Sequence, residues 1–379
     1  MNSFIELLEL KKRIIEELGG GLSGESIVKA SRDPHAFRKP RQCGVTIHTG
    51  VGCSYMCAYC YVYDMGFPAK PKPYPLSPVE LAYSLALNPY VVPMRTLAAY
   101  GSVTEPFLKE TVSRAVEYIT NIYKYFKLPS QVSTKSSLSS EVLEALMHGD
   151  KCLSILITVV TLEKHRVIEK GAPSPVDRLE GALRALKSGF RAALFIRPIV
   201  PGLTDREFEE ILSLAELHGV REIVLGSLRA TYTNVARMKA LGLDTSEIEL
   251  RLPRKPGVGE QVAVYSVDLK AKLRKLAVER GFKVFESACA ANISAHNEYC
   301  SMCSKGPCGS LEKAPKASAS EVVEFLLTEG LRVSGVSVSK TKIVVGLDKG
   351  SRLKSMGVLK AVLSQASRRM VEFSSASLS

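Results

Sequence analysis

The sequence predicts an α/β protein built on a partial (β/α)6 barrel of the TIM type, with a cysteine-rich segment and a small α/β module after it. Three observations support this fold class. Short β-rich runs alternate with longer helical patterns between residues 41 and 286, as in repeated βα units around a parallel sheet. Four of the nine cysteines fall within residues 287–316, where helical periodicity is weak. Residues 317–379 show the pattern helix, strand, strand, helix.

Taken in order, residues 1–40 form an N-terminal helix and arm, because apolar residues recur at helical spacing over 4–18 and three glycines follow at 19–21. The arm after these glycines is expected to be loose. Barrel strands are expected at 45–48, 96–100, 131–134, 153–159, 192–196, 222–225 and 283–285. Helices are expected at 108–126, 141–148, 177–188 and 205–218. Strands at 332–338 and 341–347 are expected in the tail, which is basic over 340–369.

Composition narrows the class of protein. Hydrophobic residues make up 46% and charged residues 23% of the 379 residues, as in a compact globular chain. There is no apolar run long enough to span a membrane, and the first residues do not resemble a secretory signal, so we expect a cytoplasmic protein. The net charge of +13 favours an anionic partner such as DNA or RNA, and a basic surface that binds nothing is an equally weighted alternative.

The first cysteine set consists of Cys53, Cys57 and Cys60, in one loop directly after a predicted strand. In a reducing cytosol, clustered thiols favour metal ligation over disulfides. Three thiolates can hold three irons of a 4Fe–4S cluster and leave the fourth iron open. A zinc site would need a fourth ligand, for which Cys43 and His48 are the close candidates. Three buried, unligated cysteines are the remaining alternative.

Several motifs at matching intervals carry a family resemblance. They are GCSYMCAYCY at 52–61, GSVTEP at 101–106, TKS at 134–136, APSP at 172–175 and PIVPGLTD at 198–205. Over residues 43–230 the chain resembles the radical S-adenosylmethionine (SAM) superfamily, in its spore photoproduct lyase-like branch. The resemblance implies a 4Fe–4S cluster that binds SAM and cleaves it reductively to a 5′-deoxyadenosyl radical. It also implies an electron donor such as ferredoxin or flavodoxin.

The resemblance further implies a SAM pocket at the carboxyl ends of the strands. Tyr59 matches the aromatic residue that borders the adenine, with ordinary loop packing as the alternative. Thr104 and Glu105 stand where the superfamily has a Gly-Gly-Glu segment that contacts the SAM amino group, so this sequence departs from the pattern. Lys135 matches a residue that pairs with the SAM carboxylate; a solvent-facing lysine is the alternative.

Two further strand-end residues are candidates for the same pocket. Thr158 could hydrogen-bond the ribose hydroxyls, and Arg197 could reach the SAM carboxylate or an anionic substrate. Neither these residues nor the other cysteines, Cys43 and Cys152, identify a catalytic group. Both cysteines are expected to be structural, so a thymine-dimer repair role is not supported.

The second cysteine set consists of Cys289, Cys300, Cys303 and Cys308. Four thiols can hold an auxiliary 4Fe–4S cluster, which we favour, or close a zinc site, and unligated thiols are a third possibility. His296 is expected to be a surface residue rather than a ligand.

The leading hypothesis is a radical SAM enzyme that abstracts hydrogen from an unknown substrate, with nucleic acid as the first candidate and peptides or small metabolites as alternatives. The competing class is a non-catalytic nucleic-acid-binding protein with structural zinc or iron–sulfur sites.

Overall fold

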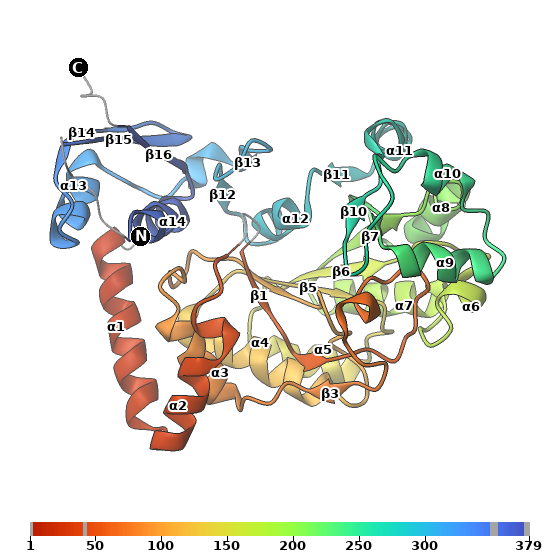
Figure 1. Ribbon diagram of the computed structural model, residues 1–379, viewed down its shortest axis with the longest axis horizontal. Coiled ribbons are helices and arrows are strands. Elements are labelled where there is room, and N and C mark those ends of the chain that lie inside the picture. The colour runs from red at the N-terminus through yellow and green to blue at the C-terminus, as the bar shows by residue number, and fades with distance from the viewer. Residues whose placement is uncertain (1–2, 41–43, 349–354, 375–379) are drawn as a thin grey trace.

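The computed structural model describes residues 3–40, 44–348 and 355–374, and its centre is a seven-stranded parallel sheet (Figure 1). The strands follow one another in chain order across the sheet, and each lies parallel to the next. This strand order confirms the partial TIM-type barrel. The sheet has seven strands, one more than six βα units would supply. The strands are β1 (Val45–Ile47), β4 (Ala98–Tyr100), β5 (Ser130–Thr134), β6 (Ser154–Thr158), β7 (Arg191–Ile199), β8 (Glu222–Ser227) and β11 (Lys283–Phe285).

Helices cover the outer face of the sheet. Alternate strand residues such as Val132, Ile155 and Leu194 are fully buried against them in the main hydrophobic core. α4 begins at Val112 rather than at residue 108, and α8 at Phe208 rather than at 205, because turns precede both helices. These helices are α3 (Pro78–Leu87), α4 (Val112–Phe126), α5 (Ser140–Met147), α7 (Pro175–Lys187), α8 (Phe208–Leu217) and α11 (Val267–Glu279).

The inner face of the sheet is partly covered by α12 (Ala288–Ala295). Leu156 of β6, Phe195 of β7 and Phe285 of β11 pack with alanines of α12 in a separate cluster. The Gln131 side chain of β5 donates to the Ala288 carbonyl at 2.7 Å. Little helix was expected in this cysteine-rich segment, and that expectation was wrong. The residues of α12 are mostly small and buried, so they give no amphipathic pattern.

The C-terminal module, α13 to β16, forms a three-stranded sheet with two helices. β14 is antiparallel to β15, and β16 is parallel to it. The prediction of helix, strand, strand, helix missed β16, a short run interrupted by a glutamate. The elements are α13 (Ala319–Thr328), β14 (Val333–Val338), β15 (Lys342–Leu347), α14 (Met356–Ser367) and β16 (Met370–Ser374).

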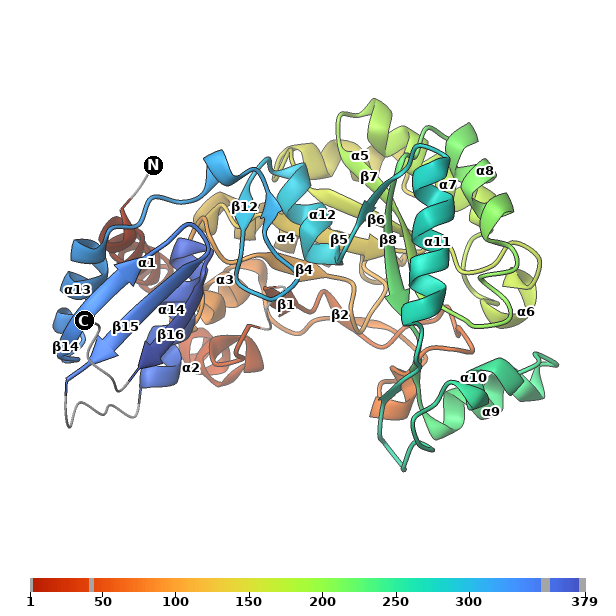
Figure 2. The ribbon, with the colours of Figure 1, turned by 90° about the horizontal axis from the view of Figure 1, so that it is seen from above.

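The N-terminal helix α1 (Phe4–Gly20) lies beside this module, as both ribbon views show (Figures 1 and 2). Phe4 packs edge-on against Phe325 with ring centroids 4.5 Å apart, and Leu7 is buried in the core of the module. The arm expected to be loose contains α2 (Gly24–Arg32), which Ser23 caps. The sequence of α2 is short and polar, so it shows no clear apolar pattern. The helix is instead supported by packing against α3.

Shorter elements complete the chain. They are η1 (Pro34–Ala36), β2 (Gly50–Val51), η2 (Tyr63–Met65), β3 (Lys72–Pro73), α6 (His165–Ile168), β9 (Arg229–Ala230), α9 (Tyr232–Ala240), α10 (Ser246–Leu250), β10 (Val262–Ala263), β12 (Tyr299–Cys300), β13 (Cys308–Gly309) and η3 (Leu311–Lys313). None of the described helices is long and apolar enough to cross a membrane. Cys43 and part of the basic run at 340–369 lie outside the described residues.

Candidate active site at the carboxyl ends of the strands

The first cysteine set lies in a tightly held loop after β2. The loop begins at Gly52, whose φ of +86° and whose 2.3 Å approach to the Pro68 carbonyl (measured from an added Cβ) exclude other residues. The Ala58 amide donates to the Ile168 carbonyl at 2.7 Å, and the Arg237 guanidinium of α9 donates to the Cys60 carbonyl at 2.5 Å. Backbone bonds to distant elements therefore fix where the three thiols stand.

The thiols share one buried environment. Cys57 is buried, and Cys53 and Cys60 are half-buried. Burial raises the pKa of all three, and the Lys135 ammonium is the main opposing effect on Cys57. Each thiol also lies in the electrostatic field of another of the three. Among the described residues, no three His, Cys, Asp or Glu side chains are close enough to share one metal ion.

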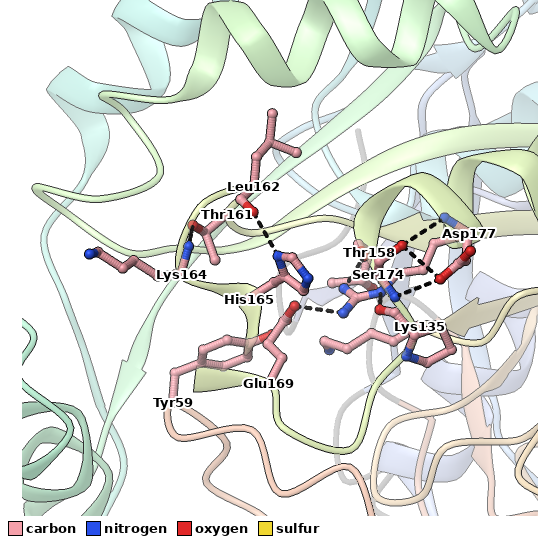
Figure 3. Close-up of polar contacts among 12 residues, drawn as sticks. Tyr59, Lys135, Thr158, Thr161, Leu162, Lys164, His165, Glu169, Ser174 and Asp177 are labelled. Carbon is pink, nitrogen blue, oxygen red and sulfur yellow. Dashed lines mark hydrogen bonds and ion pairs between the residues drawn. The ribbon is translucent and has the colours of Figure 1, made fainter. Parts of the chain in front are cut away.

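Lys135 extends from the end of β5 toward this loop. Its Nζ lies 5.5 Å from the centre of the Tyr59 ring, and Figure 3 shows it beside Tyr59 and Glu169. Burial alone would lower the pKa of the ammonium, but Cys57 and Glu169 outweigh burial and hold this pKa above its usual value. Lys135 is half-buried and faces the thiols rather than open solvent.

Tyr59 belongs to a buried polar network that includes Glu169, which lies beside it in Figure 3, and Arg178. The Tyr59 hydroxyl donates to Glu169, and Arg178 donates to the other carboxylate oxygen at 2.7 Å. Arg178 also donates to the Thr158 carbonyl at 3.0 Å and to the Pro173 carbonyl at 2.8 Å. The side chains of Glu169 and Arg178 have no exposed surface. This network ties the cysteine loop to the end of β6.

Thr104 and Glu105 support the backbone of the site. The Thr104 hydroxyl donates to the Gly52 carbonyl at 2.5 Å. The Glu105 carboxylate accepts from the Thr134 hydroxyl at 2.5 Å and from the Lys135 amide at 2.8 Å. Burial raises the pKa of Glu105, and these two hydrogen bonds oppose the rise. In this structure Glu105 therefore orients the end of β5, which bears Lys135.

Thr158 and Arg197 lie on the inner face of the barrel. Side chains two residues apart on a strand point to the same face. Thr158 therefore shares the inward face of Leu156 on β6, and Arg197 shares that of Phe195 on β7. Arg197 is exposed. A Cβ atom added to residue 226 would lie within 2.9 Å of the aliphatic carbons of the Arg197 side chain. Gly226 is thus the residue that leaves room for this arginine along β8.

The second cysteine set closes around a small hairpin. Cys300 and Cys308 are paired across β12 and β13, Cys303 lies in the turn between them, and Cys289 lies in the first turn of α12. Burial raises the pKa of Cys308, and the other three thiols raise it further, to about 11. The hairpin therefore pairs two of the four predicted cysteines, and the other two lie near enough to affect the pKa of Cys308.

Two expectations for neighbouring residues were wrong. His296 is not a surface residue: its side chain is 9% exposed and pairs with Asp150 at 2.9 Å. Cys152 is exposed in the turn before β6 and has no structural packing role. Sequence reasoning also missed Glu169 and Arg178. The only available signal was the APSP motif, because Arg178 follows it on α7.

Comparisons with known proteins agree with this geometry. The Radical SAM superfamily profile matches residues 47–215. Spore photoproduct lyase in complex with dinucleoside spore photoproduct superposes with a TM-score of 0.51 at 17% identity, over 62% of this chain and 74% of that chain. A mutant of that lyase with bound AdoMet and dinucleoside spore photoproduct gives 0.52 at 17% identity, over 64% of this chain and 76% of that chain.

No curated protein sequence matches the chain. At these identities the structural likeness is one of fold, and the superfamily match covers the segment with the first cysteine set, Lys135 and Thr158. Residues 47–215 are therefore a domain of the radical SAM superfamily, within a fold shared with spore photoproduct lyase.

Proposed function

We propose that the first cysteine set binds a 4Fe–4S cluster and that the enzyme cleaves SAM reductively to abstract hydrogen from a substrate. The observation that carries the proposal is the three-thiol loop at the carboxyl end of a parallel sheet with the Lys135 ammonium beside it. When bound, the cluster supplies the electron that splits SAM into methionine and a 5′-deoxyadenosyl radical. A ferredoxin or flavodoxin is the proposed source of that electron.

The donor set fits such a cluster better than it fits zinc. Three thiolates leave one iron of a cubane open, whereas a zinc site would need a fourth ligand. His48, a candidate fourth zinc ligand, instead contacts Arg38 at 2.9 Å and donates its amide to His35. These contacts support the enzyme over a protein with structural zinc.

In the proposed pocket, the chain binds and orients SAM. Lys135 pairs with the SAM carboxylate, since a partly desolvated ammonium binds an anion more strongly than it would in water. Thr158 offers a hydroxyl to the ribose, and Tyr59 forms the wall beside the adenine. Thr104 and Glu105 act indirectly, by holding the cysteine loop and the end of β5.

Nucleic acid remains our first candidate for the substrate. Lys270 of α11 lies near two other cations, Arg197 on the inner face and Lys305 of the second cysteine segment. Burial lowers the pKa of Lys270, and these two cations lower it further, whereas Glu286 alone opposes them. Such a group attracts an anion at the mouth of the barrel.

For the second cysteine set we propose an auxiliary 4Fe–4S cluster. The other three thiols of the set all raise the pKa of Cys308, so the four lie near one another. Four thiolates are the full set of protein ligands for an electron-transfer 4Fe–4S cluster.

The test of the enzyme is anaerobic reconstitution with iron and sulfide, followed by dithionite reduction with SAM. We expect 5′-deoxyadenosine from the wild type and from Cys152→Ala, whose thiol lies outside both sets. Cys57→Ala should give none. Zinc in both sites and no 5′-deoxyadenosine from the wild type would contradict the proposal.

The substrate proposal is tested by the retention of DNA and RNA oligonucleotides on the reconstituted protein at increasing salt. Arg197→Gln should weaken retention and lower the salt dependence by about one phosphate contact. Lys275→Gln, on the exposed side of α11, is the control and should change neither. Equal retention by both variants would refute a nucleic-acid role for the barrel mouth.

A further inference from the structure

A buried arginine of the C-terminal module lacks part of its hydrogen bonding. Arg368 follows α14 and is 1% exposed. One Nη donates to Glu298 at 2.7 Å. Nε and the other Nη are buried and have no acceptor among the described residues. An unsatisfied guanidinium N–H in the interior is costly, so these two donors point to an acceptor of another kind.

The second cysteine set lies directly beside this arginine. The Arg368 carbonyl accepts from the Ser301 amide at 2.8 Å and from the Ser301 hydroxyl at 3.0 Å, which docks the module onto β12. Cys300 is the adjacent residue. Burial raises the pKa of the Cys300 thiol, and Arg368 is the strongest opposing effect on it. The guanidinium is therefore within electrostatic reach of the thiols.

This neighbourhood has more positive than negative charge. Arg95, from the loop before β4, also has a buried Nε without an acceptor among the described residues. Burial lowers the pKa of Arg95, and Arg368 lowers it further, with Glu298 as the opposing charge. Two arginines thus face one carboxylate, and a negatively charged group at the cysteines would balance them.

We propose that Arg368 is a positioning residue of the auxiliary cluster: its two unpaired N–H groups donate to sulfur at the Cys300 side, which fastens the C-terminal module to the barrel. This inference rests on the proposed 4Fe–4S cluster in the second cysteine set. Hydrogen bonds to sulfur and nearby positive charge favour the reduced, more negative form of a cluster. Arg368 should therefore raise the reduction potential of the cluster.

The experiment uses the full chain with Cys53, Cys57 and Cys60 all changed to Ser, so that only the second set can hold iron. Iron and sulfide content are measured first, and the midpoint potential is then determined by redox titration with electron paramagnetic resonance. Arg368→Gln should keep the iron but shift the reduction equilibrium about tenfold toward the oxidised form, about 59 mV for one electron. Arg368→Lys should recover part of the shift.

Two further variants make the result specific. Arg369→Gln is the matched control, because this neighbouring buried arginine donates to the carbonyls of Ser339, Pro315 and Ser367. It should leave the potential unchanged. Glu298→Gln removes the carboxylate that offsets Arg368, so it should shift the potential to more positive values, which keeps the test open if Arg368→Gln does not assemble.

The outcomes separate the two proposals. Absence of iron, or zinc in its place, in the parent triple variant would overturn the auxiliary cluster itself. Iron at wild-type level with an unchanged potential in both Arg368→Gln and Glu298→Gln would overturn the role of Arg368 and leave the cluster standing.

Discussion

Removal of Arg178 should destabilise the protein far more than removal of a surface arginine with equally short ion-pair contacts. Arg178 and Glu169 form a pair at 2.7 Å with no exposed side-chain surface. Arg178→Met leaves the Glu169 carboxylate buried without its cation, which costs about 3–5 kcal/mol. Arg251→Met breaks a 2.8 Å pair with Asp268 at the surface, which is worth about 0–1 kcal/mol.

The double variant Glu169→Leu/Arg178→Met distinguishes the charge effect from simple loss of packing. With both charges gone, the remaining cost comes from the Tyr59 hydroxyl and the Thr158 and Pro173 carbonyls, which lose a partner at about 1–3 kcal/mol each. The double variant should therefore be more stable than Arg178→Met alone. Urea unfolding of the cluster-free protein, followed by circular dichroism, measures these free energies. An Arg178→Met variant as stable as Arg251→Met, or a double variant less stable than Arg178→Met, would refute the reasoning.

Three further predictions concern other parts of the chain. Burial and Arg38 lower the pKa of His48 to about 3, so the unfolded state binds a proton that the folded state excludes, and stability should fall as the pH falls from about 6.5 toward 3, by at most about 1.4 kcal/mol per pH unit. His48→Gln should remove one proton from this dependence in urea unfolding, and an unchanged slope would contradict it. Lys135→Met should raise the dissociation constant for SAM about 10- to 100-fold at normal iron content in equilibrium dialysis, whereas unchanged binding would remove Lys135 from the pocket. Leu7→Ala should destabilise the C-terminal module by about 2–5 kcal/mol, measured by hydrogen exchange in α13 and α14, and a loss of protection confined to α1 would contradict the shared core.

The barrel could be predicted from sequence because its outer face imposes a regular pattern. Residues such as Ile155 and Leu194 alternate with inward residues and pack against amphipathic helices. The strand period and the helix period are therefore both visible in the sequence. α12 and β16 could not be predicted in this way. α12 is rich in alanine and is held by contacts with the sheet, and β16 exists because β15 offers it a parallel edge.

The candidate site likewise has a part that could be predicted from the sequence and a part that could not. The spacing of the cysteines is a local feature, so the sequence alone predicts both ligand sets, and their role as ligands stays a prediction. Glu169 and Arg178 pair across a loop, and Glu169 also accepts from Tyr59, which lies more than a hundred residues earlier in the chain. No local sequence pattern indicates these contacts. His296 was assigned to the surface because its partner, Asp150, comes from a turn far back in the chain.

The alternation along the strands also relates the two cysteine sets to each other. Gln131 of β5 contacts α12 from the inner face, and Lys135 directly follows Thr134, the last residue of this strand. α12, which bears Cys289, thus covers the amino-terminal part of the face whose carboxyl end holds Lys135 and Arg197. The second set therefore lies over the inside of the barrel.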